Sequence, residues 1–205
     1  MMRATPESPK MFESDFVDFF SRTPWYMIPI IWIPIALGFI GWGVVNLGVA
    51  IYWVPLQMLI GWVAWTLGEY WLHRTVFHWE PDHAFGKRFH FIIHGVHHTW
   101  IDDPYRLVMP PAVSAILAVL FFSMFKGIAM MTATWFAPTW IFASFGGFVL
   151  GYVNYDLTHF AVHHVKLKSK RLIRIRAHHM NHHFNNPDRK FGFTVLIWDK
   201  VFGTH

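Results

Sequence analysis

The chain has 205 residues, a length that fits a single domain, and its composition is that of a membrane protein. Hydrophobic residues make up 54% of the sequence and charged residues only 14%, whereas soluble domains carry about 25% charged residues. The absence of cysteine excludes thiolate metal sites, disulfides and iron–sulfur clusters. The net charge of +5 would fit a nucleic-acid binder, but the basic residues lie beside apolar stretches, so we expect membrane lipids and no nucleic acid as partners.

Residues 1–24 form a predicted interfacial segment. We expect a helix that Ser8 caps, with Pro9 at its first position. Phenylalanines then recur at helical spacing with acidic residues on other faces, which is typical of an amphipathic helix in the membrane interface. The same pattern fits a helix that packs against a soluble part of the protein, and the sequence leaves both open. We expect no cleavable signal peptide, because residues 1–22 have no apolar run.

Two long apolar stretches predict four membrane-spanning helices. Residues 25–72 contain no Lys, Arg, Asp or His. Because about 20 apolar residues cross a bilayer, we expect two helices there, with a turn near 46–48. Residues 112–156 predict two more helices, near 109–126 and 134–156, with a short turn between them.

The distribution of Lys and Arg predicts the orientation of these spans. The excess lies in the N-terminal segment and in the polar segments 73–111 and 157–205, and the short connections hold only Lys126. Both termini and both polar segments are therefore expected in the cytosol, at the inner membrane of a bacterium or the endoplasmic reticulum of a eukaryote. The predicted fold is all-α: a single domain over 1–205, with four transmembrane helices and a cytosolic histidine-rich helical cap.

Histidines dominate the two polar segments. Fifteen occur in the chain, none before position 73. Most fall in four groups: His73-x4-His78, His94-x2-His97-His98, His159-x3-His163-His164 and His178-His179-x2-His182-His183. Residues three and four apart share a helix face, so we expect each group to be one set of metal ligands, with a bend near Val76 to bring the first pair together. Outside the groups, His83, His90 and His205 are expected to be structural.

Ten of these histidines fit a strict ligand pattern. They are His73, His78, His94, His97, His98, His159, His163, His179, His182 and His183. His164 and His178 are additional candidates, and the spacing favours His179 over His178. Ten imidazoles are too many for one ion and suit two, but imidazole binds iron, zinc and copper alike, so the ligands do not choose the metal.

Several runs carry a family resemblance in a fixed order over about residues 65–204. They are Gly68-Glu69-Tyr70-Trp71-Leu72-His73-Arg74, His90-Phe91-x2-His94-Gly95-Val96-His97-His98, Tyr105-Arg106-Leu107-Val108-Met109-Pro110-Pro111, Gly151-Tyr152-Val153, Asp156-x2-His159-Phe160-x2-His163-His164, His179-x2-His182-His183-Phe184, Phe191-Gly192-Phe193 and Trp198-Asp199-x2-Phe202-Gly203-Thr204. The chain resembles the fatty acid hydroxylase superfamily and, within it, the fatty acid 2-hydroxylases. The 2-hydroxylase assignment rests mainly on the run that begins at Tyr105.

The resemblance implies O2-dependent hydroxylation at C2 of a long-chain fatty acid or lipid acyl chain. It implies two metal ions held by the ten histidines, a di-iron pair in the active enzyme that zinc could replace in purified protein. No other cofactor-binding residue and no catalytic residue beyond the ligands is expected. Eukaryotic members commonly carry a fused cytochrome b-type domain, whereas only 24 residues precede the first span here and no His-Pro-Gly-Gly motif occurs. A separate electron-donor protein and its reductase are therefore expected.

Carboxylates near the histidines are candidates for orienting the ligand rings. Metal-bound imidazoles usually donate their second N–H to a carboxylate or carbonyl. The candidates are Glu69, Asp156, Asp102, Asp103 and Asp199. A carboxylate near a helix end can equally be a cap, and this alternative stays open.

Tyr105 and Arg106 are candidates for contact with the polar end of the substrate, with lipid phosphates as the alternative partner.

Two other functions remain open at this stage. A sterol or other lipid hydroxylase or desaturase of the same superfamily would use the same metal pair. A membrane metal transporter or metal-binding protein is the alternative from another class. It is disfavoured because transporter sites lie near the bilayer midplane, whereas these histidines lie outside the apolar stretches.

Overall fold

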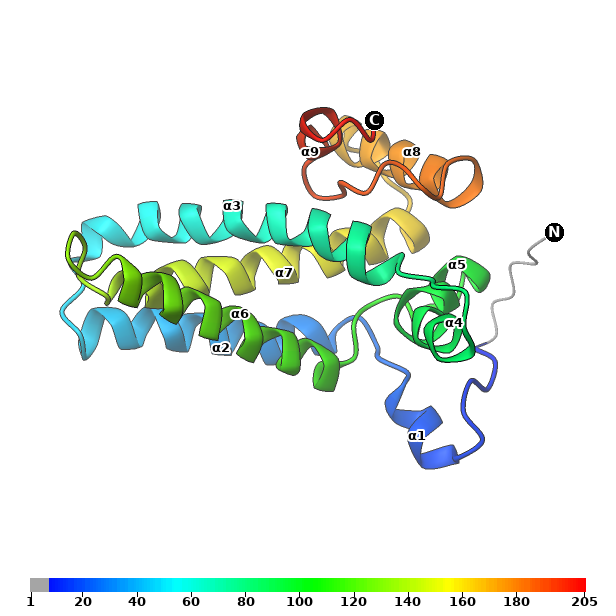
Figure 1. Ribbon diagram of the computed structural model, residues 1–205, viewed down its shortest axis with the longest axis horizontal. Helices are drawn as coiled ribbons and strands as arrows, with labels where there is room; N and C mark the ends of the chain where they lie inside the picture. Colours follow the sequence, from blue (N-terminus) through cyan, green and yellow to red (C-terminus); the bar gives the residue numbers. More distant parts are fainter. Residues whose placement is uncertain (1–7) are drawn as a thin grey trace. The chain divides into compact units, whose positions relative to one another are not determined.

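The computed structural model describes residues 8–205, which form helices and no strand (Figure 1). The α-helices are α1 (Asp15–Phe20), α2 (Met27–Val45), α3 (Val54–Leu72), α4 (Ala84–His90), α5 (Val96–Thr99), α6 (Pro111–Met131), α7 (Trp140–His164), α8 (Lys170–Phe184) and α9 (Ile197–Val201). A 3-10 turn, η1 (Ile51–Trp53), and two π-helices, η2 (His73–Phe77) and η3 (Phe91–Gly95), complete the elements. The predicted all-α class is confirmed.

The chain folds into two compact units. The bundle unit consists of Tyr26–Trp65 and Met109–Asn154. The histidine unit consists of the residues up to Trp25, Thr66–Val108 and Tyr155–His205, and it contains every histidine of the chain.

Within residues 8–205, three helices are long and apolar enough to cross a membrane, at Met27–Val45, Ile51–Phe77 and Pro111–Met131. They coincide with the first three predicted spans and indicate an integral membrane protein. The turn predicted near 46–48 is present, because α2 ends at Val45 and Gly48 has a φ of 67°. Helix α7 has 25 residues, but it is less apolar because Asn154 and Asp156 lie within it.

Glycines let α3 and α7 pack closely in the bundle unit (Figure 1). A Cβ at Gly61 would lie 1.7 Å from the carbonyl oxygen of Ser144, and one at Gly147 would lie 2.1 Å from that of Met58. Lipid tails are as apolar as the side chains between helices, so close packing between small residues is a main source of helix association in a membrane. The two glycines therefore set the separation between these helices.

Phenylalanine rings fill the contact between α2, α6 and α7. The Phe39 ring lies 5.1 Å from that of Phe122 and 4.9 Å from that of Phe145, measured between centroids. Phe122 and Phe145 are themselves 5.0 Å apart. Aromatic pairs at these separations add to the stability that apolar contact provides.

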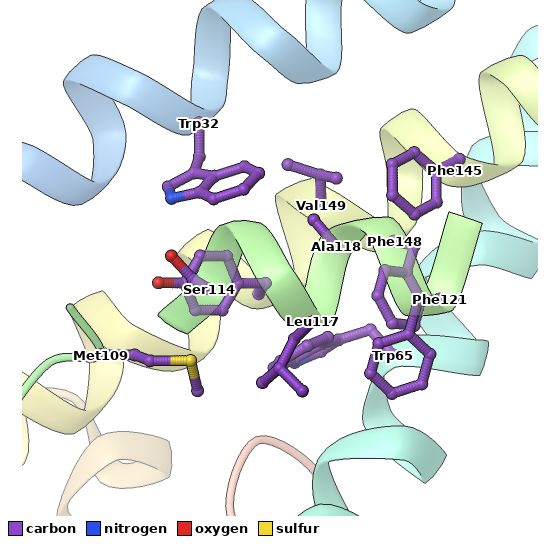
Figure 2. A pocket seen from close by; sticks show the side chains of 11 residues that line it. Trp32, Trp65, Met109, Ser114, Leu117, Ala118, Phe121, Phe145, Phe148 and Val149 are labelled. Atoms are coloured by element: carbon purple, nitrogen blue, oxygen red, sulfur yellow. The ribbon is translucent and has the colours of Figure 1, made fainter. Parts of the chain in front are cut away.

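An apolar cavity of about 20 Å³ lies within the bundle unit (Figure 2). Its lining includes Trp32 on α2, Trp65 on α3, Leu117 and Phe121 on α6, and Phe148 on α7. A cavity of this size holds about one water molecule, so it is too small for an acyl chain.

The N-terminal helix begins later than the sequence predicts. Ser14 rather than Ser8 is its N-cap, with the Ser14 hydroxyl 3.5 Å from the N–H of Val17. Ser8 instead donates its hydroxyl to Asp103 Oδ2 at 2.8 Å and accepts a hydrogen bond from Arg106 at 2.9 Å. These partners are far away in the sequence, so Ser8 gave no local sign of them and its predicted capping role is wrong.

The substitution Gly61→Ala should destabilise the bundle unit by about 1–3 kcal/mol, because the added Cβ overlaps the α7 backbone. The matched control is Gly38→Ala on α2, where no described atom lies within 4 Å of the added Cβ. The control should keep or raise stability, since alanine favours the helix over glycine. Thermal unfolding midpoints in detergent compare the two variants, and equal midpoints would contradict the close α3–α7 contact.

Candidate metal centre

The first histidine pair converges through a π-helix. His78 donates its backbone N–H to the carbonyl of His73 at 3.2 Å, a bond between residues five apart. An α-helix would turn two such residues about 140° apart, whereas the wider π turn brings them back to one side. Their Nε2 atoms are 3.2 Å apart. The π turn of η2 thus brings His73 and His78 together, which is the effect that we expected from a bend near Val76.

The ten histidines of the strict pattern come together in two groups of five. The first group is His73, His78, His94, His98 and His182, and the second is His97, His159, His163, His179 and His183. Within each group, one ring nitrogen of every histidine lies within 4.8 Å of all the others. Both groups lie in the histidine unit, and each could hold a metal ion.

Two of the sequence groups are divided between these sites, so the prediction that each forms one ligand set is wrong there. His94 and His98 belong to the first group, and His97 between them belongs to the second. On α8, His179 and His183 belong to the second group and His182 to the first. At about 100° per residue, histidines four apart lie about 40° apart around the helix and can reach the same group. Adjacent histidines lie about 100° apart, so His97 and His98 face different groups, and so do His182 and His183.

Backbone carbonyls fix the tautomers of two rings in the first group. His73 Nδ1 lies 2.8 Å from the carbonyl oxygen of Phe191, and His182 Nδ1 lies 2.6 Å from that of Arg189. A carbonyl oxygen can only accept, so each Nδ1 carries the hydrogen in the neutral ring. Each Nε2 therefore presents a lone pair to the other members of the group.

The ring nitrogens lie as close together as ligand atoms that coordinate one cation. His78 Nε2 lies 3.2 Å from His73 Nε2 and 3.0 Å from His182 Nε2, so one hydrogen would have to serve two acceptors. In the second group, His179 Nε2 lies 2.9 Å from Nε2 of each of its partners His159, His163 and His183. Hydrogen bonds cannot satisfy three such contacts through one atom. Converging imidazole lone pairs are the donor set of zinc, iron or copper, and the residues fit such ions.

Burial keeps the rings in the form that binds metal. Burial, followed by the neighbouring His182 and His98, lowers the pKa of His78 to about 2. Burial and the neighbouring His182 lower the pKa of His98 to about 2 as well. In the second group, burial holds the pKa of His97 well below its usual value. Neutral imidazole is the ligand form, so no proton has to be displaced at neutral pH.

The loop after α8 supplies both carbonyls that orient the first group. Lys190 adopts the left-handed conformation, with a φ of 63°, and its N–H donates to the carbonyl of Thr204 at 2.7 Å. This turn lies between Arg189 and Phe191, whose carbonyls reach His182 and His73. Sequence reasoning missed the loop, although the run Phe191-Gly192-Phe193 is part of the family resemblance.

Two of the predicted carboxylates hold this loop. Asp199 Oδ2 accepts the N–H of Gly192 at 3.0 Å, and Glu69 Oε1 accepts those of Phe193 and Thr194 at 3.0 and 2.6 Å. Glu69 and Asp199 thus support the ligands through the backbone that orients them.

The remaining candidates lie outside the two groups. His178 Nε2 lies 2.9 Å from Asp199 Oδ2, and His164 is only half-buried. Asp156 is 1% exposed, whereas Asp102 is exposed. Asp103 accepts the N–H of Tyr105 at 2.9 Å. A ligand or orienting role for these residues stays a prediction.

Arg106 is engaged by the protein. Its buried guanidinium donates to Asp18 at 2.8 Å and lies 3.4 Å from Asp103. The Tyr105 side chain is 45% exposed, and its carbonyl accepts the N–H of Thr23 at 2.6 Å. Contact of Tyr105 and Arg106 with a substrate stays a prediction.

The sequence model described as "Fatty acid hydroxylase" matches residues 58–204. The chain belongs to the fatty acid hydroxylase family. A dihydroceramide fatty acyl 2-hydroxylase of Arabidopsis thaliana is 39% identical over 201 residues, which cover 98% of this chain and 81% of the plant protein. The fatty acid 2-hydroxylase of Homo sapiens is 33% identical over 217 residues, covering 95% of this chain and 56% of the human protein.

A solved structure, full-length scs7p with only its hydroxylase domain visible, is similar to this fold with a TM-score of 0.83. The two are 34% identical, and the match covers 93% of this chain and 70% of that one. The resemblance read from the histidine and carboxylate motifs is confirmed.

Replacing Lys190 should separate the role of the loop's backbone from that of the lysine side chain. Lys190→Pro cannot adopt a φ of 63° and lacks the N–H that Thr204 accepts, so it should weaken metal binding by about 10–100-fold. Lys190→Gly keeps both features and should bind metal like the wild type. Competition titration with a chelator measures both affinities, and a Lys190→Pro variant of unchanged affinity would disprove the role of the loop.

Removing a ring of the first group should remove bound metal. His98→Ala deletes one of five converging nitrogens and should lower the metal content of the purified protein. His205→Ala removes an exposed histidine outside both groups and should leave that content unchanged. Elemental analysis by mass spectrometry gives metal per chain, and full metal content in His98→Ala would overturn the grouping.

Proposed function

We propose that this member of the fatty acid hydroxylase family is an O2-dependent enzyme that hydroxylates C2 of a long acyl chain. The observation that carries the proposal is the convergence of ten histidines in two groups of five, with neutral rings and lone pairs aimed at common points. Relatives named as dihydroceramide or ceramide hydroxylases support an acyl chain of a sphingolipid as the substrate, with a free fatty acid as the other form.

Each group of five histidines would hold one iron ion. When bound, the two ions supply the redox chemistry that activates O2, which imidazole-ligated iron performs elsewhere. The protein's own residues then have three tasks. The carbonyls of Arg189 and Phe191 keep His182 and His73 in the ligating tautomer, the burial of the rings excludes water, and the surrounding fold must align C2 of the substrate with the centre.

The reaction also needs a supply of electrons. One oxygen atom enters the C–H bond and the other leaves as water, which consumes two electrons and two protons for each turnover. Ten of the chain's fifteen histidines are assigned as metal ligands in this proposal, and the sequence has no cysteine for an iron–sulfur cluster. The proposal therefore includes a separate electron-donor protein and its reductase.

The proposed membrane arrangement has four spans within one hydroxylase domain over residues 1–205. The first part of α7, to about residue 156, would be the fourth span beside the three apolar helices. Both termini and the histidine unit would then lie on the cytosolic side, next to the basic residues that follow α7. The membrane would be the inner membrane of a bacterium or the endoplasmic reticulum of a eukaryote.

The test is mass spectrometry of acid-hydrolysed lipids from cells that also supply an electron donor and reductase. Cells with the wild type or the control His205→Ala should contain 2-hydroxy fatty acids. Cells with His98→Ala/His182→Ala should lack them, because each change removes a nitrogen of the first group.

Metal-loaded wild type that yields desaturated or sterol products and no 2-hydroxy acid would overturn the C2 assignment in favour of another lipid oxidation. Analysis of intact lipids then separates sphingolipid acyl chains from free acids.

A further inference from the structure

Helix α1 exposes its apolar side chains and buries an acid. Phe16, Phe19 and Phe20 are 73%, 71% and 61% exposed, whereas Asp18 is only 4% exposed. A helix that packs against a soluble core has the opposite pattern. The alternative that α1 packs its phenylalanines against the rest of the protein therefore does not hold for this structure.

The exposed rings form one continuous patch. At about 100° per residue, Phe16 and Phe20 lie opposite Asp18 on the helix, and Phe19 flanks them. The ring centroids of Phe16 and Phe20 are 4.9 Å apart, and those of Phe19 and Phe20 are 5.4 Å apart. Contiguous apolar patches of this kind mark interaction sites.

Charged hydrogen bonds keep this face outward. Asp18 Oδ1 accepts the N–H of Met11 at 2.6 Å and a guanidinium N–H of Arg106 at 2.8 Å, and Asp18 Oδ2 pairs with Arg22 at 2.7 Å. Burial alone would raise the pKa of Asp18, but the hydrogen bonds from Met11 and Phe12 and the two guanidinium groups outweigh it and lower the pKa. Rolling α1 to hide its rings would break the 2.8 Å ion pair of the buried Arg106 with Asp18 and leave it only the longer 3.4 Å contact with Asp103.

The chain holds α1 close to the membrane. Phe20 ends α1 and Met27 begins the first apolar helix, so the connecting residues span at most about 25 Å when extended. Trp25 and Tyr26, just before that helix, are 43% and 49% exposed, and such aromatics are typical of the membrane–water interface. A lipid surface is therefore within reach of the patch.

We propose that Phe16, Phe19 and Phe20 insert into the lipid interface and that the Asp18–Arg106 ion pair presents them to it. The occupant of this face is a lipid surface rather than a second copy or another protein. Arg106 also lies 5.6 Å from the ring of Trp100, directly after the helix that carries His97 and His98. The anchor is thus connected to the segment that bears the metal-site histidines.

The chain has no cysteine, so single cysteines can be labelled cleanly. Full-length Phe16→Cys and Phe19→Cys, each carrying an environment-sensitive fluorophore, would be reconstituted into phosphatidylcholine vesicles. Glu13→Cys, just before the helix and exposed, is the matched control. The labels at 16 and 19 should emit at shorter wavelength, be quenched by acyl-chain nitroxides and be shielded from aqueous iodide, whereas the label at 13 should remain accessible to iodide.

Two results would overturn lipid insertion. One is equal access of iodide to all three labels. The other is shielding at positions 16 and 19 that vanishes as protein is diluted into excess lipid, which would mean that a second copy covers the patch.

The ion pair is tested by Asp18→Asn in the labelled Phe16→Cys background. It should return the label to the aqueous quencher, because the neutral amide no longer pairs with Arg106. The control Asp15→Asn alters an exposed carboxylate on the same helix, which forms a surface ion pair with the exposed Lys10, and should leave the label shielded. Unchanged shielding in Asp18→Asn would remove the ion pair from the proposal, while the wild-type labelling result stands by itself.

Discussion

The convergence of neutral imidazole lone pairs is the constraint on which the rest of the histidine unit depends. Nitrogens that face one another at about 3 Å cannot all be satisfied by hydrogen bonds, because neutral imidazole has one N–H and the carbonyls of Arg189 and Phe191 use it in two of the rings. Such an arrangement persists only where the surrounding structure holds it. A metal ion bound by these lone pairs would relieve the repulsion, so metal affinity and folding would be coupled.

The support for this arrangement comes mainly from backbone. The π turn of η2 brings His73 and His78 to the same side. The left-handed turn at Lys190 orients the carbonyls of Arg189 and Phe191 toward the rings. Glu69 and Asp199 accept hydrogen bonds from the backbone N–H groups that follow Phe191. Backbone groups bound in this way are less free to move than long side chains. The carboxylates do not contact the rings of His73 and His182 directly but bind peptide groups of the loop. The orientation of the two rings therefore depends on the conformation of the loop.

The sequence predicted the parts of this protein that local pattern determines. The apolar runs predicted four spans, and three of them coincide with helices long and apolar enough to cross a membrane. Asn46 and Gly48 predicted the turn after α2, and the spacing of histidines predicted which ten gather. What it did not predict depends on contacts between distant residues. Nothing near Ser8 indicates that its hydroxyl bonds Asp103. The spacing around His97 likewise does not indicate that its partners come from α7 and α8. The burial of Asp18 likewise depends on Arg106, 88 positions later in the chain.

The division of adjacent histidines between the two groups limits where this chain can tolerate a change in length. His97 and His98 serve different groups, and so do His182 and His183. Inserting or deleting one residue in α5 or α8 would rotate every following ring by about 100° and exchange the partners of the two groups. We therefore expect length changes to be tolerated in the connections between helices and not between the histidines of α5 or of α8.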